Sequence, residues 1–505
     1  MGPGSALRLS GTTLERVFAP HSNNISNALA YSIAWHGSRW KNARSHFGDA
    51  ATILRLNAIS ATPGGTMTKH TYIPRTTNYT LNPGDELNDL RMSDQVRPLY
   101  DHVRKFIRDT VEPMSIEFAK AGEGKEDRWS FTPKQLEVLE KAKNKAKQEG
   151  LWNFFLPDDE TGQGLKNLDY AYIASELGKS PLASESMNCS APDTGNMEVL
   201  ERVGTKEQKE KWLKPLMNGE IRSAYVMTEP NVASSDAKNI STSAKLVGDE
   251  WVINGEKYYI SGVGDPRCKI LIVMVKTNPD AAPSKQQSQI LVPRDTPGVE
   301  VLGPMYVFGQ DHAPRGHMHM RFNNVRVPKE NILLGEGRGF EISQLRLGPG
   351  RIHHCMRTIG KAEKALDLMV QRGLTREAFG KKIAHLGGNM QIIAQARCEI
   401  EAMRLMVLKA AKAMDVLGNK EARIWVSMVK AMVPERAAKI IDQAIQMHGA
   451  LGVSQHTPLA RMYANTRTLR IADGPDEVHH MVVGRNELHQ LRETADSSLA
   501  AVFRN

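Results

Sequence analysis

The chain has 505 residues, of which 41% are hydrophobic and 24% charged, as expected for a folded protein of several domains. Its formal net charge is +10, but the basic residues are scattered and no nucleic-acid-binding motif is present, which disfavours a nucleic-acid partner and leaves anionic small molecules or an acidic protein. The four cysteines form no CxxC pair and no apolar run reaches the roughly 20 residues of a membrane span, so neither a zinc knuckle, a disulfide framework nor a transmembrane segment is predicted.

Residues 1–66 differ in composition from the rest of the chain. They contain six Lys and Arg, only two acidic residues, and many Ser and Asn, which is typical of an organelle transit peptide. A disordered extension, or a true start at Met67, explains the same composition. We expect a leader or disordered extension here and a mitochondrial location, with the peroxisome as the alternative, although the terminal "AVFRN" is not a peroxisomal address.

Residues 87–222 have the apolar spacing of helices. In "DQVRPLYDHVRKFIRDTVEP" the apolar side chains recur every three or four residues. Thr132 and Thr205 each stand directly before an amphipathic stretch, in the position of a helix N-cap. The sequence therefore predicts an N-terminal helical domain.

Residues 223–338 change to a period of two. "EWVINGEKYYIS" contains Asn254-Gly255, which predicts a hairpin between two short strands, and "KILIVMVKT", "QSQILVPR" and "GHMHMRFNNVRV" predict further strands. The best candidate for a metal site is a group of three histidines, His312, His317 and His319. No Cys or acidic ligand stands at a suitable spacing from them, so a metal site is not favoured. We predict a compact β domain.

Residues 339–490 return to long apolar helical patterns joined by short loops, which predicts an antiparallel helical bundle followed by a tail at 491–505. The predicted fold class is therefore α+β and multi-domain, with the β domain between two helical ones.

Two stretches near the β domain carry groups that suit a ligand. "YVMTEPNVASSD" (residues 225–236) is dense in hydroxyl and amide donors for a flavin ring or a ligand carbonyl, although a polar loop of turn formers explains it as well. In "GEKYYISGVG", Tyr258 and Tyr259 alternate faces, and either ring is able to lie against a flat cofactor or to pack on the sheet.

Three stretches in the C-terminal region suggest further ligand contacts. Arg376 and Lys381 in "LTREAFGKKI" suit a diphosphate, although a solvated basic helix end is the ordinary alternative. Gly449 and Gly452 in "AIQMHGALGV" either bring backbone close to a ligand or simply end a helix. "RIADGPDEVHH" places Asp473, Asp476 and Glu477 around a Gly-Pro turn, which is either an acidic surface turn or the position of a catalytic carboxylate.

The order of these stretches resembles the acyl-CoA dehydrogenase family, over about Asp89 to Gln490, and is most similar to the dehydrogenase portion of animal family members ten and eleven. The resemblance implies an N-terminal helical domain, a central β domain and a C-terminal four-helix bundle. It also implies FAD as cofactor, an acyl-CoA as substrate, an electron-transferring flavoprotein as electron acceptor, and a homodimer or homotetramer in which a second subunit completes each FAD site. The implied reaction is the α,β-dehydrogenation of a fatty acyl-CoA to the trans-2-enoyl-CoA in fatty-acid β-oxidation.

The same resemblance implies roles for individual residues of this chain. The residues implied to bind the cofactor are Tyr225, Met227, Thr228, Ser234, Ser235, Tyr259, Ile260, Ser261, Arg376, Phe379, Gln446, Gly449, Gly474, Pro475 and Glu477. The residues implied to bind the substrate are Ser235, Gly348, Arg351 and Gly474. Among the former, Arg376 and Phe379 match residues that reach the FAD of the partner subunit.

The resemblance also identifies Asp473 as the catalytic base, at the position of the family's usual Glu. The α-proton of the substrate is weakly acidic, so its removal needs a strong base. We therefore expect Asp473 to lie in a dry pocket that raises the basicity of its carboxylate. Some relatives carry the base instead on a bundle helix, but that position is Gly350 here. Because Asp is shorter than Glu by one methylene, a catalytically weak acyl-CoA- and FAD-binding regulatory protein is kept as the alternative. An acyl-CoA oxidase is disfavoured, since the chain ends before the further helical domain usual in oxidases.

Overall fold

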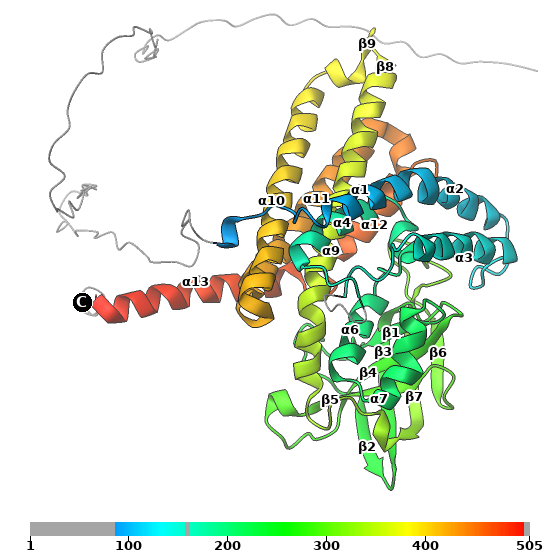
Figure 1. Cartoon of the computed structure of the whole chain (residues 1–505), viewed down its shortest axis with the longest axis vertical. Helices are drawn as coiled ribbons and strands as arrows, with labels where there is room; N and C mark the ends of the chain where they lie inside the picture. Colours follow the sequence, from blue (N-terminus) through cyan, green and yellow to red (C-terminus); the bar gives the residue numbers. More distant parts are fainter. Residues whose placement is uncertain (1–85, 157–161, 499–505) are drawn as a thin grey trace, which may run out of the picture. The chain divides into compact units, whose positions relative to one another are not determined.

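The structure is a computed structural model that describes residues 86–156 and 162–498, with residues 491–498 described by their backbone alone (Figure 1). The predicted leader at 1–66 lies outside the described residues. Within the described ranges, no helix combines the length and apolar character needed to cross a membrane.

The first part of the described chain is helical. Thr132 and Thr205 both form the predicted N-caps: each side chain accepts a hydrogen bond from the third residue of its helix, and the side chain of that residue, Gln135 or Gln208, accepts one in return. The helices are α1 (Arg97–Phe106), α2 (Glu112–Ala121), α3 (Pro133–Gln148), α4 (Asn167–Leu177), α5 (Ala183–Ser186), α6 (Asp193–Val203), α7 (Lys206–Gln208) and α8 (Lys214–Met217), with π-helical turns at Ile107–Val111 and Lys209–Leu213.

A seven-stranded sheet follows, in the order β1-β4-β2-β3-β7-β6, with β5 paired to β4. Strand β1 runs parallel to β4, while β3 and β7 form a long antiparallel pair. The strands are β1 (Arg222–Val226), β2 (Ser243–Val247), β3 (Glu250–Ser261), β4 (Cys268–Lys276), β5 (Gln287–Pro293), β6 (Val299–Pro304) and β7 (His317–Pro328).

The predicted hairpin at Asn254-Gly255 is wrong, because β3 runs without a turn through both residues. The turn between β2 and β3 lies instead at Gly248 and Asp249, since Val247 pairs with Glu250. Gly255 has φ +148°, and a Cβ there would collide with Thr242. The glycine is therefore explained by the close approach of a neighbouring segment rather than by a turn.

The C-terminal part is a bundle of long helices, in which α9, α10 and α11 pack against one another and α13 packs against α11 (Figure 1). The helices are α9 (Gly339–Thr375), α10 (Asn389–Glu421), α11 (Arg423–His448), α12 (Leu459–Thr468) and α13 (Asp476–Ser498), and the hairpin strands β8 (Glu377–Ala378) and β9 (Lys381–Lys382) follow α9. Helix α13 thus runs into the segment predicted as a tail. Short 3-10 turns lie at Glu86–Asn88, Pro283–Lys285, Lys329–Asn331, Ile383–His385 and Gly449–Val453.

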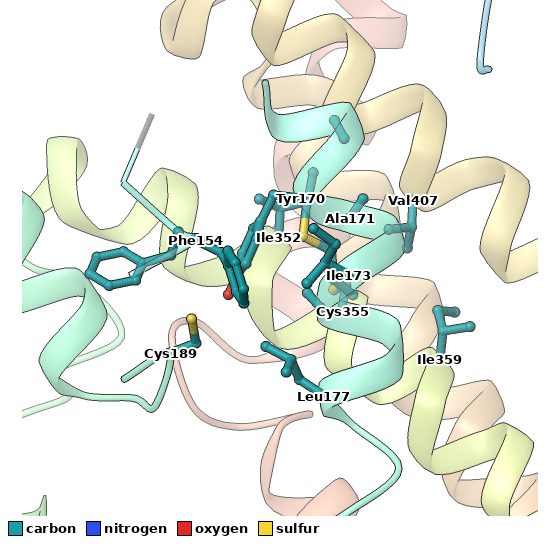
Figure 2. Close-up of a cluster of buried hydrophobic side chains, with 14 of the residues drawn as sticks. Phe154, Tyr170, Ala171, Ile173, Leu177, Cys189, Ile352, Cys355, Ile359 and Val407 are labelled. Atoms are coloured by element: carbon teal, nitrogen blue, oxygen red, sulfur yellow. The ribbon is translucent and has the colours of Figure 1, made fainter. Parts of the chain in front are cut away.

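The N-terminal helices and the bundle share one hydrophobic core, in which α4 lies against α9 (Figure 2). Tyr170, Ile173 and Leu177 of α4 are buried beside Ile352 and Ile359 of α9. Two glycines allow this close packing, because a Cβ on Gly360 would overlap the carbonyl oxygen of Ser175 and one on Gly178 would overlap that of Arg357. The contact fixes the middle of α9, next to the N-terminal half that forms one wall of the site described next.

Candidate active site

The site is built around the turn between α12 and α13, which contains the acidic residues singled out from the sequence. Asp473 and Gly474 both have positive φ, at +57° and +101°. Asp476 closes the turn: its backbone N–H donates to the carbonyl of Arg470 over 3.0 Å, and its carboxylate accepts from Arg470 Nε over 2.6 Å. Glu477 is exposed. The three carboxylates therefore differ in role, and Asp473 is the one that faces α9.

Cationic side chains from two helices hold the backbone of the turn. Arg351 of α9 donates from Nε to the carbonyl of Asp473 over 2.9 Å. Lys430 of α11, which is fully buried, donates from Nζ to the carbonyl of Gly474 over 3.1 Å and also to that of Leu469. A Cβ on Gly474 would lie only 2.9 Å from His479 Nε2. The turn is thus tied to the bundle, and only glycine fits at its tightest point.

The carboxylate of Asp473 lies beside the N-terminal half of α9 and is one fifth exposed. Its Oδ2 is 3.4 Å from His354 Nε2. The same oxygen would be 3.8 Å from a Cβ on Gly350, an ordinary van der Waals distance. The Asp473 carboxylate and the helix position at Gly350 therefore face the same small region, and the glycine leaves that region open.

The electrostatics of Asp473 differ from the raised basicity expected from the sequence. Burial acts to raise the pKa of Asp473, but the charges of His354, Arg346, Arg351 and Lys430 outweigh it, so its pKa lies below the ordinary value of 3.8. Burial also lowers the pKa of His354 to about 3, which leaves this imidazole neutral at pH 7. The charges near Asp473 that remain at pH 7 are those of Arg346, Arg351 and Lys430.

Tyr225 links the sheet to α9. Its hydroxyl accepts a hydrogen bond from Gln289 Nε2 over 2.9 Å and lies 2.9 Å from Ser343 Oγ. The guanidinium of Arg346 covers its ring at 4.0 Å from the ring centre, while Arg346 Nε donates to Asn196 Oδ1. The polar end of Tyr225 is thus occupied within the protein.

A buried ion pair holds the loop that contains Met227, Thr228, Ser234 and Ser235. Glu229 is 1% exposed, accepts from Lys257 Nζ over 2.8 Å and also accepts from the backbone N–H groups of Ser241 and Thr242. Lys257 donates in addition to the carbonyl of Met227 over 2.9 Å. Ser234 Oγ accepts from the N–H of Glu229, whereas Ser235 is exposed. Ser234 therefore stabilises the loop through a hydrogen bond within it, whereas Ser235 is exposed on the surface.

The end of β3 brings three further predicted residues to the same part of the sheet. Tyr259 has φ +53° at a register shift in the pairing with β7, and its side chain is 44% exposed. Ile260 is buried, and Ser261 is exposed, with Oγ 2.8 Å from His317 Nδ1. The end of the strand therefore presents an exposed tyrosine and an exposed hydroxyl.

Four predicted residues lie elsewhere, at the C-terminal end of α9. Arg376 is the C-cap of α9, directly before β8, and Phe379 lies between β8 and β9, where it is 95% exposed. Gln446 is exposed and Gly449 ends α11, close to α9 because Met447 lies beside Gly373. At 1.5 Å per residue, this end of α9 is about 40 Å from Gly350. The structure does not bring these residues to Asp473 within one chain.

Several residues that shape the site were not predicted from the sequence. The buried Lys430, His354 and the Glu229–Lys257 pair were all missed. Lys430 and Lys257 could have been recognised from the sequence, because each occupies a position where the apolar pattern of its helix or strand predicts a buried hydrophobic residue. No group of three or more His, Cys, Asp or Glu able to hold a metal occurs among the described residues.

Three family profiles match the chain: acyl-CoA dehydrogenase N-terminal domain at residues 93–220, middle domain at 224–325 and C-terminal domain at 337–488. The chain is 50% identical to mouse acyl-CoA dehydrogenase family member 10 over 85% of its own length, and spans 40% of that relative and about half of several other curated relatives. It is 55% identical to FadE2 of Mycobacterium tuberculosis, a candidate acyl-CoA dehydrogenase, over 71% of this chain and 87% of FadE2.

The solved structures agree with the sequence matches. A Mycobacterium abscessus protein described as a candidate acyl-CoA dehydrogenase superposes with a TM-score of 0.76 at 47% identity, over 79% of this chain and all of that one. All three regions of the described fold, in their order along the chain, therefore have counterparts in one family. The chain belongs to the acyl-CoA dehydrogenase family.

Proposed function

We propose that this protein is an FAD-dependent acyl-CoA dehydrogenase that converts a fatty acyl-CoA to the trans-2-enoyl-CoA in β-oxidation, with Asp473 as the base. The observation that carries the proposal is the position of the Asp473 carboxylate. It is fixed through its own backbone by Arg351, stands against the open face of α9 at Gly350, and is ionised at neutral pH. An ionised, immobilised carboxylate beside an open surface is what removal of a proton from a bound substrate requires.

The residues near the sheet fit a flavin. Tyr259 and Ser261 present a ring and a hydroxyl from one exposed strand end, and the loop from Met227 to Ser235 is held rigid from within by Glu229 and Lys257. A planar heterocycle needs such a combination of a flat apolar contact and fixed polar groups at its edge. When bound, FAD supplies the acceptor for the hydride that leaves the β-carbon.

The chain's own residues supply the proton chemistry. Asp473 takes the α-proton, the electron pair of that C–H bond enters the new double bond, and a hydride leaves the neighbouring carbon, so the step balances as the loss of one proton and one hydride. The low pKa of Asp473 makes it a weak base in the free protein. Substrate binding that displaces water from the carboxylate would strengthen it, because burial acts to raise its pKa.

The partners follow from the same proposal. The exposed Arg376 and Phe379 suit contact with a second copy of the chain, because a phenylalanine ring that is 95% exposed is costly to leave in water. We propose a homodimer or homotetramer, acyl-CoA as substrate and an electron-transferring flavoprotein as the electron acceptor. We further propose the mitochondrion as the location, on the composition of residues 1–66 alone.

A second candidate function is a catalytically weak acyl-CoA- and FAD-binding protein. The observation that favours it is the pKa of Asp473, which lies below its ordinary value instead of above it. The shorter side chain of Asp relative to Glu also favours this candidate, since a misplacement of the base by about 1 Å can reduce the rate about a hundredfold.

Anaerobic titration of the purified flavoprotein with acyl-CoAs of different length and branching tests the proposal. We expect bleaching of the flavin absorbance by at least one acyl-CoA, and its loss in Asp473→Asn. The matched control is Asp367→Asn, which makes the same chemical change at an exposed carboxylate of α9 outside the site and should bleach as the wild type does. Bound flavin that no acyl-CoA bleaches would favour the binding protein, and equal bleaching in Asp473→Asn would place the base elsewhere.

A further inference from the structure

Three polar side chains form a hydrogen-bonded row at the end of β3. Ser261 lies directly across from His317 of β7 in the strand register, and Ser261 Oγ is 2.8 Å from His317 Nδ1. The other ring nitrogen, His317 Nε2, is 3.1 Å from Nδ1 of His312. Paired residues on neighbouring antiparallel strands point to the same face, so the row begins at an exposed hydroxyl and ends inside the protein.

The inner end of the row defines the direction of its hydrogen bonds. His312 Nε2 is buried, and no group in the described part of the chain bonds to it. A buried N–H without an acceptor is costlier than a buried lone pair without a donor. The proton of His312 therefore belongs on Nδ1, from which it donates to His317 Nε2. This leaves the proton of His317 on its own Nδ1, from which it donates to Ser261 Oγ.

Both rings are neutral at pH 7, as this arrangement requires. Burial, followed by the neighbouring His312, lowers the pKa of His317 to about 4. Burial, followed by Arg461 of α12, lowers the pKa of His312. Each ring thus carries a single N–H proton, and each of these protons is assigned to Nδ1.

This assignment of the histidine protons determines the direction in which the Ser261 hydroxyl donates. Because its oxygen accepts a hydrogen bond from His317, the proton of its own hydroxyl is free to be donated outward. With the opposite direction, the hydroxyl would donate inward to His317 and offer only lone pairs to a ligand. The ring system of a flavin carries several acceptor atoms and a single N–H donor, so an outward donor is the more useful of the two.

The loop that carries His312 also reaches the catalytic side of the molecule. Phe308, in the same loop, packs edge to face on Tyr463 of α12 with ring centres 6.2 Å apart. Helix α12 leads directly into the turn that carries Asp473. The loop that carries His312 therefore contacts the helix that leads into the turn of Asp473.

We propose that His317 and His312 are positioning residues that hold the Ser261 hydroxyl as an outward hydrogen-bond donor to the flavin ring. This inference rests on the proposed FAD site. It differs from that proposal in assigning a direction to one hydrogen bond and in giving a role to two histidines that the family resemblance did not identify.

A double-mutant cycle on FAD binding tests the coupling. FAD is titrated into the apoprotein, with binding followed by flavin fluorescence, for the wild type, Ser261→Ala, His317→Phe and the double variant. We expect each single variant to weaken binding by roughly two- to tenfold and the double variant to be no weaker than Ser261→Ala, because the histidine acts through the serine. His317→Asn should recover most of the affinity, since its amide keeps a donor near the position of Nδ1.

The matched control is His319→Phe. His319 stands two residues along β7 and is bonded to Glu256 instead of to Ser261, so this variant should bind FAD as the wild type does. Independent, additive losses in the double-mutant cycle would overturn the proposal. So would wild-type affinity in either Ser261→Ala or His317→Phe, or an equal loss in His319→Phe.

Nitrogen NMR of histidine-labelled protein without FAD gives a second readout that does not depend on the cofactor. The signals of His312 and His317 are assigned by their loss in His312→Phe and His317→Phe, and we expect both rings to carry their proton on Nδ1. A proton on Nε2 of either ring would overturn the assigned direction. If both protons are on Nδ1 but the wild type binds no FAD, the proposed function fails and the flavin is excluded as the acceptor.

Discussion

Asp473, the proposed base, combines two properties that act against each other in proton abstraction. Arg351 fixes its backbone and thereby its position, while the charges that surround it lower its pKa. A base is active when deprotonated, so a lower pKa keeps the free protein competent further into acid but makes each proton transfer less favourable. The low pKa therefore keeps the Asp473 carboxylate ionised over a wide pH range, but it makes proton transfer to this carboxylate less favourable.

A pH prediction follows from this. The second-order rate constant for flavin reduction, which reports the free protein, should not lose activity through Asp473 between pH 8 and pH 5, because the pKa of Asp473 lies below 3.8. Replacing Arg346 by Met removes one of the charges that lower it, so the acid limb should move to higher pH. Stopped-flow reduction at a series of pH values measures both. An acid limb near pH 6 in the wild type that moves to a different pH in Asp473→Glu would contradict the low pKa.

Glu198 of α6 offers a residue-scale prediction about stability. Its carboxylate is 3% exposed, without a hydrogen-bond partner in the described chain, and burial raises its pKa to about 8. The folded protein thus binds a proton that the unfolded chain has released above about pH 4.5, so stability falls as pH rises from there through 8. Glu198→Gln should remove this loss and raise stability at pH 9 by about 1–4 kcal/mol, since one pKa unit corresponds to about 1.4 kcal/mol.

Thermal melts at pH 5 and pH 9 measure this effect. Glu201→Gln is the control, because Glu201 lies on the same helix but is a quarter exposed and paired with Lys209. It should shift the melting temperature little and equally at both pH values. A stabilisation by Glu198→Gln that is the same at pH 5 and pH 9 would contradict a raised pKa for Glu198.

At the scale of elements, the contact between α4 and α9 yields a prediction with a control on the same helix. Gly360→Ala places a methyl group onto the carbonyl oxygen of Ser175 and should destabilise the protein by about 1–3 kcal/mol or more. Gly348→Ala has open space around its Cβ and should stabilise by up to about 1 kcal/mol through helix propensity. Urea denaturation measures both, and equal effects of the two substitutions would contradict the packing.

The elements also show which features were predictable from sequence. The N-caps at Thr132 and Thr205 were predicted correctly, because a capping box depends only on residues three positions apart. The hairpin at Asn254-Gly255 was predicted wrongly, because the need for Gly255 comes from Thr242, a residue on another segment. Local signals were reliable where the cause was local and failed where a distant neighbour was the cause.

At the scale of the whole molecule, the order of stretches along the chain was enough to predict the family and the fold class. The sequence also pointed to Asp473, but it did not reveal that Lys430, Arg351 and His354 surround it. These residues come from two helices that are brought together only by the packing of the bundle. Their role follows from tertiary structure, which no periodicity in the sequence reports.

The long helix α9 separates the predicted site residues into two groups. Gly348 and Arg351 lie near its beginning beside Asp473, whereas Arg376 and Phe379 follow its end, about 40 Å away. One chain is therefore unable to bring both groups to one cofactor. Under the proposed function, the second group acts on the site of another subunit.

Mixed dimers test this division. We expect Asp473→Asn and the pair Arg376→Ala/Phe379→Ala each to inactivate the proposed homodimer, the first by removing the base and the second by weakening the cofactor site of the partner. A mixed dimer of the two, isolated with two different tags, contains one site with both groups intact. It should recover about half of the wild-type rate per dimer, because one of its two symmetry-related sites is complete. The control combines all three substitutions in one chain and pairs it with Asp473→Asn, which leaves no site with its base and should stay inactive. If both groups served the same chain's site, every site of the mixed dimer would lack one group, and no activity would return.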